Sequence, residues 1–436
     1  MNDVCVYGLW HLGSVTAAGM SVLGFQVEAT DPDANVVKAL SSGVPPIFEP
    51  NLGETLQQQI KSGRLLFNPD VKTALSRSAI VWVTFDTPVD DRDIADVNYV
   101  VERVFDVMKV CGDDTTILIS SQLPVGTLKT LEASARALFS GKKIKFACVP
   151  ENLRLGNALE VFLKPDRIVV GIRTNDQRQK LSNVFERFET EIVWMSIESA
   201  EMTKHAINSF LAASVAFANE LASISGLAGA DIDEVEKGLK TDVRIGSRAY
   251  LRSGSAFSGG TLARDIRFLN DFSSNHGLQL HLLKAIEESN DIHKNWYKHK
   301  ISDLFSDLNG IKIVIWGLAY KAGTNTLRRS LAVELGDWLL EKKAELGVFD
   351  PIITELPLNW IGNVRALTHP LDWVSECNLL IVTGDWPTLL QDVRNLEHSI
   401  CRGAYVLDAD RKLQTIRQPL IEKGVRYFSV GIKEQS

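Results

Sequence analysis

The sequence lacks paired cysteines, an excess of positive charge and a long uninterrupted apolar run. Its five cysteines are scattered over 436 residues, without the spacings that are typical of a disulfide framework or a zinc site. Lysine and arginine number 47 against 54 acidic residues, a formal net charge of −7, which argues against a general surface for nucleic acid. We therefore expect a reducing, cytoplasmic location, no metal site and no nucleic-acid partner.

The chain also shows no sign of export or membrane insertion. Its N-terminus, Met-Asn-Asp-Val-Cys, has no basic segment followed by an apolar run, so we expect no signal peptide. The most apolar helix-like stretch, 210–218, is shorter than the roughly 20 residues that a membrane-spanning helix needs. With 45% hydrophobic and 23% charged residues, the composition is that of a globular protein of two or three domains.

Short apolar runs alternate with longer amphipathic segments over residues 1–197. This alternation is typical of a parallel, doubly wound sheet with helices on both faces. It stops in the middle of the chain and resumes near residue 310. We expect strands at 4–7, 26–30, 80–85, 116–120, 144–148, 168–171 and 192–195, and again at 312–316, 346–349, 379–382 and 405–407.

Between these two regions the sequence favours helices. Residues 198–224 place apolar side chains at helical spacing without a proline, which predicts one long central helix. Residues 227–295 continue the pattern but are interrupted by a loop at 252–260, and loops of this kind often contact ligands. The expected fold is α/β, with two doubly wound Rossmann-like domains, 1–197 and 301–436, joined by the long helix and a helical middle domain, 198–300.

The two ends of the chain resemble each other. Val4-Cys-Val-Tyr-Gly-Leu precedes a predicted strand that ends at Asp31, and Ile313-Val-Ile-Trp-Gly-Leu precedes one that ends at Asp350. This similarity indicates two mononucleotide-binding halves. A strand, a glycine turn and an acidic strand end also recur in unrelated α/β proteins, so the choice between internal duplication and shared physics stays open.

An imperfect dinucleotide-binding turn, Gly-Leu-Trp-His-Leu-Gly, runs from Gly8 to Gly13 after the first predicted strand. Such a turn lets the backbone N–H groups of a helix N-terminus bind a pyrophosphate. Trp10 replaces the middle glycine, so we expect it to displace the cofactor or reshape the turn. Asp31 would accept hydrogen bonds from the adenosine ribose and favour NAD over NADP, unless it only caps the helix that follows.

Several further segments, in order along nearly the whole chain, resemble the UDP-glucose/GDP-mannose dehydrogenase family. The resemblance implies NAD-dependent oxidation at C6 of a nucleoside diphosphate sugar, most simply a UDP-hexose, by a homodimer that needs no membrane. The segments are 45–52 (PPIFEPNL), 87–88 (TP), 124–127 (PVGT), 150–156 (PENLRLG), 165–171 (PDRIVVG), 201–208 (EMTKHAIN), 254–265 (GSAFSGGTLARD), 317–321 (GLAYK) and 324–330 (TNTLRRS).

The resemblance assigns catalytic positions to Glu151, Lys204, Asn208, Thr261 and Asp265. Lys204 and Asn208 are four residues apart, so they share one helical face. A cation and an amide donor there suit the stabilisation of negative charge on a reacting oxygen. The ordinary alternative for Lys204 is a solvent-exposed lysine on a helix surface.

Three residues depart from the family pattern. Thr261 stands where the family has a cysteine that attacks the intermediate aldehyde, and a threonine hydroxyl is a far weaker nucleophile. Gln122 and Leu155 replace a threonine and a glutamate. The product could therefore be the uronic acid or only the aldehyde. Two alternatives to this oxidation stay open: a catalytically weak or inactive relative that binds nucleotide sugar or NAD, and an enzyme that oxidises transiently and regenerates NAD.

The resemblance also assigns the binding residues. Arg244 would reach the sugar site of a second subunit, and the apolar face of the central helix would supply a dimer core, although that helix could instead bury its face within one chain. The cofactor positions are Gly8, Leu12, Gly13, Asp31, Thr87, Pro88 and Arg328, and the substrate positions are Leu153, Arg244, Tyr250, Leu251, Phe257, Gly259 and Lys321.

Overall fold

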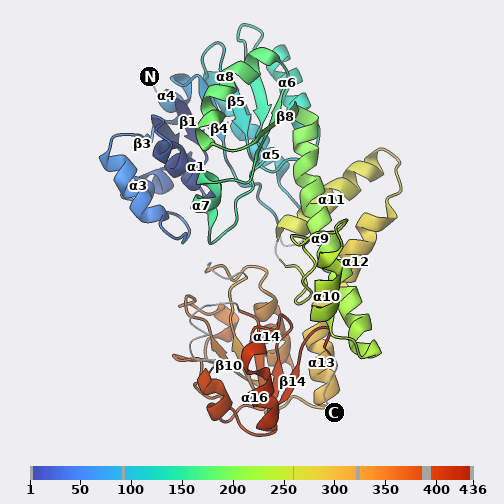
Figure 1. Cartoon of the computed structure of the whole chain (residues 1–436). Coiled ribbons are helices and arrows are strands. Elements are labelled where there is room, and N and C mark those ends of the chain that lie inside the picture. Colours follow the sequence, from blue (N-terminus) through green and yellow to red (C-terminus); the bar gives the residue numbers. More distant parts are fainter. Residues whose placement is uncertain (1–2, 91–93, 259, 321–324, 385–393, 433–436) are drawn as a thin grey trace. The chain divides into compact units, whose positions relative to one another are not determined.

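A computed structural model of the chain describes residues 3–90, 94–258, 260–320, 325–384 and 394–432. The chain divides into two compact units, Met1–Ile207 and Asn208–Ser436 (Figure 1). Two predicted site residues, Gly259 and Lys321, lie outside the described residues. The division into two units does not test the three predicted domain boundaries, which stay a prediction.

The first unit contains an eight-stranded sheet. Its strands are β1 (Val4–Tyr7), β2 (Val27–Thr30), β3 (Leu65–Phe67), β4 (Ile80–Val83), β5 (Thr116–Ile119), β6 (Lys145–Cys148), β7 (Ile168–Ile172) and β8 (Ile192–Ser196). Their order is β3-β2-β1-β4-β5-β6-β7-β8. The seven predicted strands are confirmed within one or two residues at their ends, and β3 was not predicted.

The expectation of a wholly parallel sheet is wrong at one point. β7 pairs antiparallel to β6 through Gly171 and Cys148, and β8 runs parallel to β7. The connection from β6 to β7 contains a loop and the six-residue helix α7 (Ala158–Leu163), whose residues pack into the core on one face of the sheet.

Helices cover both faces of this sheet, which is why its strands are mostly apolar. Val4 and Val6 of β1 pack into the core on one face, and Cys5 and Tyr7 pack into the core on the other. The first face also contains residues of α1 (His11–Val22), α2 (Ala34–Ser41), α3 (Leu52–Lys61), α7 and α8 (Asn175–Phe185), and the second contains residues of α4 (Val71–Ser76), α5 (Val97–Val110), α6 (Thr127–Leu138) and the start of α9 (Ile197–Ala228).

The long central helix is confirmed as α9, which has 32 residues and is the green helix of Figure 1. It is longer than the stretch 210–218 that the sequence singled out. Among the described residues it is the one helix that could cross a membrane by length and composition, with a mean hydropathy of 1.4 over its apolar window, of which 44% is buried within the protein. A core helix meets the same criterion, so α9 alone does not indicate a membrane protein.

The second unit begins with helices that pack on the C-terminal part of α9. Ala212 and Ala216 of α9 form a small core with Ile266 and Ile286, and alanine lets neighbouring helices approach closely on that side. The helices of this part are α10 (Ile232–Thr241), α11 (Gly260–Asn275), α12 (His281–Lys294) and α13 (Trp296–Leu304).

A six-stranded parallel sheet completes the second unit. Its order is β11-β10-β9-β12-β13-β14, so both sheets contain the strand order 3-2-1-4-5-6 of a doubly wound dinucleotide-binding fold. The prediction of two Rossmann-like domains with a helical middle is confirmed. The strands are β9 (Lys312–Trp316), β10 (Glu345–Phe349), β11 (Val364–Ala366), β12 (Leu379–Val382), β13 (Tyr405–Leu407) and β14 (Arg426–Phe428), with helices α14 (Leu331–Glu341) and α16 (Arg417–Glu422).

The similarity between the two ends of the chain extends to their hydrogen bonds. Leu9 N donates to a carboxylate oxygen of Asp31 at 2.6 Å, and Leu318 N donates to Asp350 at 2.7 Å. In each sheet the acidic side chain at the end of the second strand therefore holds the turn that follows the first strand.

A threonine completes each turn in the same way. Thr84 Oγ1 donates to the carbonyl of Gly8 at 2.7 Å, and Thr383 Oγ1 donates to the carbonyl of Gly317 at 2.5 Å. Both glycines have positive φ, 100° and 92°, a conformation that costs glycine little. The two halves therefore share the contacts that hold the turn after the first strand, although a helix starts at His11 in the first half and, among the described residues, only at Leu331 in the second.

Two helix-interior glycines of the second unit test the packing. A Cβ on Gly336 in α14 would lie 2.4 Å from the ring of the buried Trp360, whereas one on Gly238 in α10 meets no atom within 4 Å. We expect Gly336→Ala to lower the melting temperature, since overpacking costs about 1–3 kcal/mol. Gly238→Ala should raise it, because alanine is favoured over glycine in a helix by up to about 1 kcal/mol. Equal shifts of both variants in thermal unfolding would contradict the packing around Trp360.

Candidate functional site

The turn from Gly8 to Gly13 has the geometry of a dinucleotide-binding turn. A Cβ on Gly13 would lie 1.7 Å from the carbonyl oxygen of Gly8, so this close approach of helix and strand requires glycine. Trp10 has a φ of −70°, which any residue adopts, and its side chain is 49% exposed. The backbone of the turn therefore needs no glycine at Trp10, and the effect of the indole on the cofactor stays a prediction.

Asp31 lies beside this turn and does not cap the next helix. It accepts hydrogen bonds from the backbone N–H groups of Leu9 at 2.6 Å and Asp33 at 2.8 Å. The N-cap of α2 is Asp33, which accepts from Asn35 N at 2.8 Å. Burial raises the pKa of Asp31 above its ordinary value. Asp31 itself therefore does not cap α2, and its contact with a ribose stays a prediction.

The remaining cofactor positions lie at the ends of neighbouring strands or in the second unit. Leu12 is buried in the first turn of α1, Thr87 is buried and Pro88 is exposed. Thr87 Oγ1 donates to the carbonyl of Gln122 at 2.6 Å, which joins the loops that follow β4 and β5. Arg328 is exposed in the second unit. The glycine turn, the N-terminus of α1 and Asp31 together fit the diphosphate and ribose of NAD.

In the first unit, the candidate catalytic residues Lys204 and Glu151 contact each other. The Lys204 ammonium donates to the backbone carbonyl of Glu151 at 2.7 Å and lies 3.1 Å from a carboxylate oxygen of the same residue, with only 12% of the lysine side chain exposed. The second carboxylate oxygen of Glu151 accepts from Leu153 N at 2.8 Å. The alternative of a solvent-exposed lysine is therefore excluded.

A small cavity of about 20 Å³ lies against this pair. A buried water needs about 10–15 Å³ measured in this way, so the cavity has room for one. Its lining brings Glu151 and Lys204 together with the residues that follow β5 and β6. The lining residues are Ser120, Ser121, Gln122, Leu123, Leu128, Cys148, Pro150, Glu151, Glu201, Lys204 and His205.

Two buried residues on the same part of α9 hold the loop after β5. Glu201 accepts hydrogen bonds from Gly126 N at 2.8 Å and Leu128 N at 3.0 Å, where α6 begins and its N–H groups have no partner within the helix. The ring of His205 hydrogen-bonds the carbonyl of Leu123 at 2.9 Å. Burial raises the pKa of Glu201. These two side chains fix the segment that carries Gln122.

In the second unit, Asn208 of α9 donates a hydrogen bond to Asp265 of α11. Both residues are buried, with exposed fractions of 5% and 0%, so the pair is shielded from water. Thr261, in the first turn of α11, is exposed. The structure thus brings Asn208 and Asp265 together, as their shared role requires, and places Thr261 at the surface of this unit.

The loop at 253–257, part of the segment predicted to contact a ligand, is held by buried polar side chains. Asn219 of α9 accepts from Gly254 N at 2.9 Å, and the ring of His293 in α12 hydrogen-bonds the carbonyl of Gly254 at 2.7 Å. Asn290 accepts from Phe257 N at 2.9 Å and donates to its carbonyl at 3.0 Å. Burial lowers the pKa of His293, which favours the neutral ring.

Asp410, after β13, holds the centre of the same loop. It accepts from Ser255 N at 2.6 Å and from Ser255 Oγ at 3.0 Å. A Cβ on Gly254 would lie 2.2 Å from an Asp410 oxygen, so only glycine fits beside it. Although burial opposes ionisation, Lys412 at 3.0 Å and the bonds from Ser255 hold the pKa of Asp410 below its ordinary value. The loop is therefore rigidly presented before any ligand arrives.

The structure does not bring the predicted substrate residues together in one described pocket. Tyr250 is 59% exposed, Leu251 and Leu153 are half-buried, and Phe257 packs against the helical core around Ala212, which leaves part of its ring for a ligand. Arg244 extends from the surface and pairs with Asp242 at 2.7 Å, with 85% of the arginine side chain exposed.

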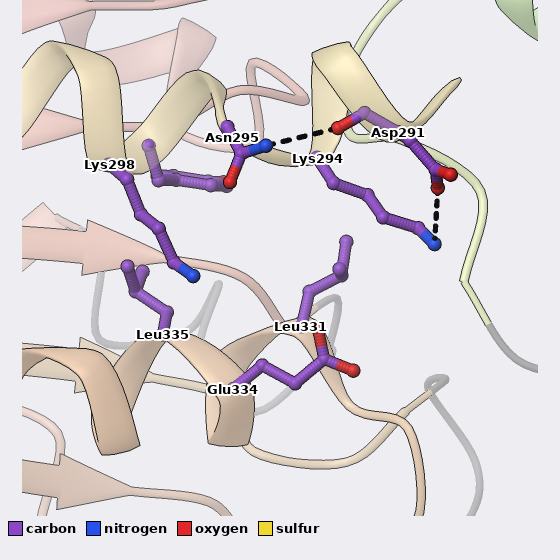
Figure 2. Close-up of a pocket in the computed structure, with 8 residues that line it drawn as sticks. Asp291, Lys294, Asn295, Lys298, Leu331, Glu334 and Leu335 are labelled. Carbon is purple, nitrogen blue, oxygen red and sulfur yellow. Dashed lines mark hydrogen bonds and ion pairs between the residues drawn. The ribbon is translucent and has the colours of Figure 1, made fainter. Parts of the chain in front are cut away.

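A separate cavity of about 260 Å³ lies between α12, α13 and α14. Figure 2 shows Lys298 and Glu334 on opposite walls and Lys294 paired with Asp291 at 3.0 Å. Two lysines face two carboxylates, so the cavity has no charge preference for a diphosphate. None of the predicted site residues that the structure describes lines it; its lining is Asp291, Lys294, Asn295, Tyr297, Lys298, Leu331, Glu334 and Leu335.

The sequence prediction missed several residues that hold the site. Asn219 could have been found, because it lies eleven residues, about three helical turns, after Asn208, and a buried polar group needs a partner. Glu49, Glu201 and His205 stand in the segments 45–52 and 201–208 that resemble the family, but no role was assigned to them. Asn290, His293 and Asp410 carry no such pattern, since their partners are distant in sequence.

Comparison with known proteins covers both units. Three models of the UDP-glucose/GDP-mannose dehydrogenase family match in order: the NAD binding domain at residues 2–189, the central domain at 198–292 and the UDP binding domain at 314–415. The chain is 30% identical over 435 residues to a UDP-glucose 6-dehydrogenase of Rickettsia conorii, with 99% of this chain and 100% of that protein covered.

Solved structures agree with the sequence comparison. A UDP-glucose dehydrogenase from Pyrobaculum islandicum matches with a TM-score of 0.87 and 28% identity over 99% of this chain and 98% of that one. A UDP-D-ManNAc dehydrogenase from Pyrococcus horikoshii matches with a TM-score of 0.83 over 98% of this chain and 99% of that one, at 21% identity, and shows likeness of fold.

Asp31 and Asp350 provide a matched test of the dinucleotide site, since each holds the turn of its own half. We expect Asp31→Asn to weaken NAD binding at least about tenfold, because hydrogen bonds to a charged group contribute about 1.5–3 kcal/mol. The variant should also bind NADP better relative to NAD, since the charge that repels a 2′-phosphate is removed. Asp350→Asn should leave NAD binding unchanged. Calorimetric titration checks this, and equal losses in both variants would contradict the assignment.

Proposed function

Because the chain belongs to the UDP-glucose/GDP-mannose dehydrogenase family, we propose that it oxidises C6 of a UDP-hexose with NAD. The observation that carries this proposal is the buried Lys204, held by Glu151 at 2.7 Å and 3.1 Å. A fixed cation beside a carboxylate suits an alcohol that must lose both a proton and a hydride. The Rickettsia relative, a UDP-glucose 6-dehydrogenase by name, supports the choice of sugar.

The first oxidation converts the C6 hydroxymethyl group to an aldehyde. The C6–H bond breaks with its electron pair, the hydroxyl gives its proton to the Glu151 carboxylate as general base, and NAD when bound supplies the hydride acceptor. Lys204 stabilises the negative charge that develops on the oxygen, and Glu151 keeps the ammonium in place. In the second unit, the buried Asn208–Asp265 pair fixes α9 against α11, and the loop 253–257 contacts the nucleotide sugar.

The second oxidation, from aldehyde to acid, has no thiolate to assist it, because Thr261 stands where the family has a cysteine. Thr261 offers only a hydroxyl, and an activated alcohol needs a dedicated base. Cys148 lines the cavity beside Lys204, but burial raises the pKa of its thiol well above the ordinary value, so it stays protonated. The product of the proposed reaction is therefore the aldehyde, with one NADH formed per sugar.

The test is the stoichiometry of the purified protein with NAD and a panel of UDP- and GDP-sugars, from NADH absorbance and the mass of the sugar product. We expect an aldehyde and one NADH per UDP-hexose. Thr261→Cys should raise the ratio toward two and yield the acid, because a thiol can form the covalent intermediate. Thr261→Ser, the matched control, should keep the ratio at one.

Further outcomes of this assay separate the alternatives. An acid with two NADH from the unaltered chain would contradict the truncated reaction. Binding of NAD and sugar without any turnover would favour a non-catalytic relative. A changed sugar without accumulated NADH would favour transient oxidation with NAD regenerated.

We also propose that the protein is a cytoplasmic homodimer, with the outer face of α9 as its core. Phe210, Phe217 and Ile224 are 71%, 52% and 62% exposed and recur every seven residues, so they form one apolar stripe on the helix. A second copy offers the same stripe, and a self-complementary patch is what a two-fold interface needs. The five free cysteines suit a reducing cytoplasm.

Light scattering after size-exclusion chromatography tests the dimer. The unaltered 48.3 kDa chain should elute with the mass of a dimer, and Phe217→Asp should elute as a monomer, because a buried unpaired charge is costly. Leu358→Asp, at a residue that is 87% exposed elsewhere in the second unit, is the control and should stay dimeric. A monomeric wild-type chain at micromolar concentration would remove the proposal.

A further inference from the structure

Glu49 is a buried carboxylate that nothing in the proposed reaction uses. It lies in the loop before α3, with 4% of its surface exposed. Its two oxygens accept three hydrogen bonds: from the ring of His11 at 2.9 Å, from Gly156 N at 3.0 Å and from Ala158 N at 2.7 Å. A buried carboxylate is costly unless it is paired in this way, so the loop is built around these donors.

The donors come from two functional segments that are far apart in sequence. His11 is the first residue of α1, directly after the turn where the cofactor's pyrophosphate would lie. Gly156 and Ala158 end the segment that begins with Glu151, the residue that holds Lys204. Glu49 is thus the polar link between the cofactor turn and the catalytic loop.

A second contact between the same elements is apolar and lies further along α1. A Cβ on Gly19 would lie 2.2 Å from the ring of Phe162 in α7, so α1 and α7 are packed as closely as glycine allows. Interiors packed at this density transmit displacement rather than absorb it. At the other end of α1, near the cofactor turn, the contact with the catalytic loop is polar. Of the polar side chains described above, only Glu49 makes it.

We propose that Glu49, through His11, is a positioning residue that couples occupancy of the cofactor turn to the placement of the loop 150–158. A dinucleotide on the first turn of α1 orders His11, His11 and Glu49 order Gly156 and Ala158, and the loop then presents Glu151 and Lys204 to the sugar. This inference rests on the proposed function for the identity of the two ligands.

The consequence is that the two ligands bind cooperatively. Coupling between sites of one protein is typically about 5- to 150-fold in affinity and is reciprocal. Glutamine at position 49 would remove the charge and turn one acceptor into a donor that faces other donors. The substitution Glu49→Gln should therefore reduce the cooperativity between the two ligands more than it reduces the affinity for either ligand alone.

The experiment measures the dissociation constant of UDP-glucose by calorimetry without and with saturating NADH, a pair that cannot react. In the unaltered protein NADH should tighten UDP-glucose binding at least about fivefold. Glu49→Gln and His11→Phe should reduce that ratio to near one. His11→Gln, whose amide can still donate to Glu49, should keep most of it, which a purely steric role would not explain.

Glu28→Gln is the matched control. Glu28 is also a buried carboxylate of this unit, 1% exposed, and accepts from Asn68 at 2.6 Å, a bond between β2 and the residue that follows β3. It should keep the full ratio even if it lowers stability. An unchanged ratio in both Glu49→Gln and His11→Phe, or no coupling in the unaltered protein, would overturn the inference. Failure of the unaltered chain to bind both ligands would instead reject the proposed function on which it rests.

Discussion

The site depends on a set of polar side chains on α9, because a buried polar group needs a hydrogen-bond partner. Four of them find that partner in loops near the candidate site residues. Glu201 and His205 hold the segment after β5, Lys204 holds Glu151, and in the second unit Asn219 holds Gly254. The helix would be a simple apolar core element without these residues. With them, its polar side chains set the positions of the catalytic loops in each unit, so changes on α9 should act on binding and catalysis before they act on the fold.

The two Rossmann-like halves share one hydrogen-bonded arrangement but differ in the other bonds that its acidic residue makes. In each, an acidic residue at the end of the second strand holds the glycine turn. Asp31 accepts one further bond, from Asp33 N, whereas Asp350 also accepts from Ala319, Ile352 and Ile353. The carboxylate of Asp31 therefore keeps acceptor capacity for a ribose, while that of Asp350 is spent on its own backbone. Similar local sequence thus leaves acceptor capacity at Asp31 and uses that of Asp350 for the backbone around it.

Much of this architecture could be predicted because it is written in local patterns. Apolar runs buried on both faces identified the strands, and the spacing on α9 identified the long helix. The strands β3, β11 and β14 were missed because each has three residues at an outer edge of its sheet, where packing demands little. The hydrogen bonds that hold the loop 253–257 were missed for another reason. Ser255 donates to Asp410, which is 155 residues away in sequence, and no local pattern encodes such a pairing. The effect of Trp10 stays a prediction, because its backbone needs no glycine and only the bulk of its side chain bears on a pyrophosphate.

We propose above all that this chain, despite Thr261, still transfers a hydride from C6 of a nucleotide sugar to NAD. The most direct measurement uses UDP-glucose that carries two deuterium atoms at C6, in a single turnover with NAD, followed by mass analysis of both products. We expect one deuterium in the reduced cofactor and one left in a sugar aldehyde. Reduced cofactor that carries no deuterium, or none formed while both ligands bind, would contradict the proposal.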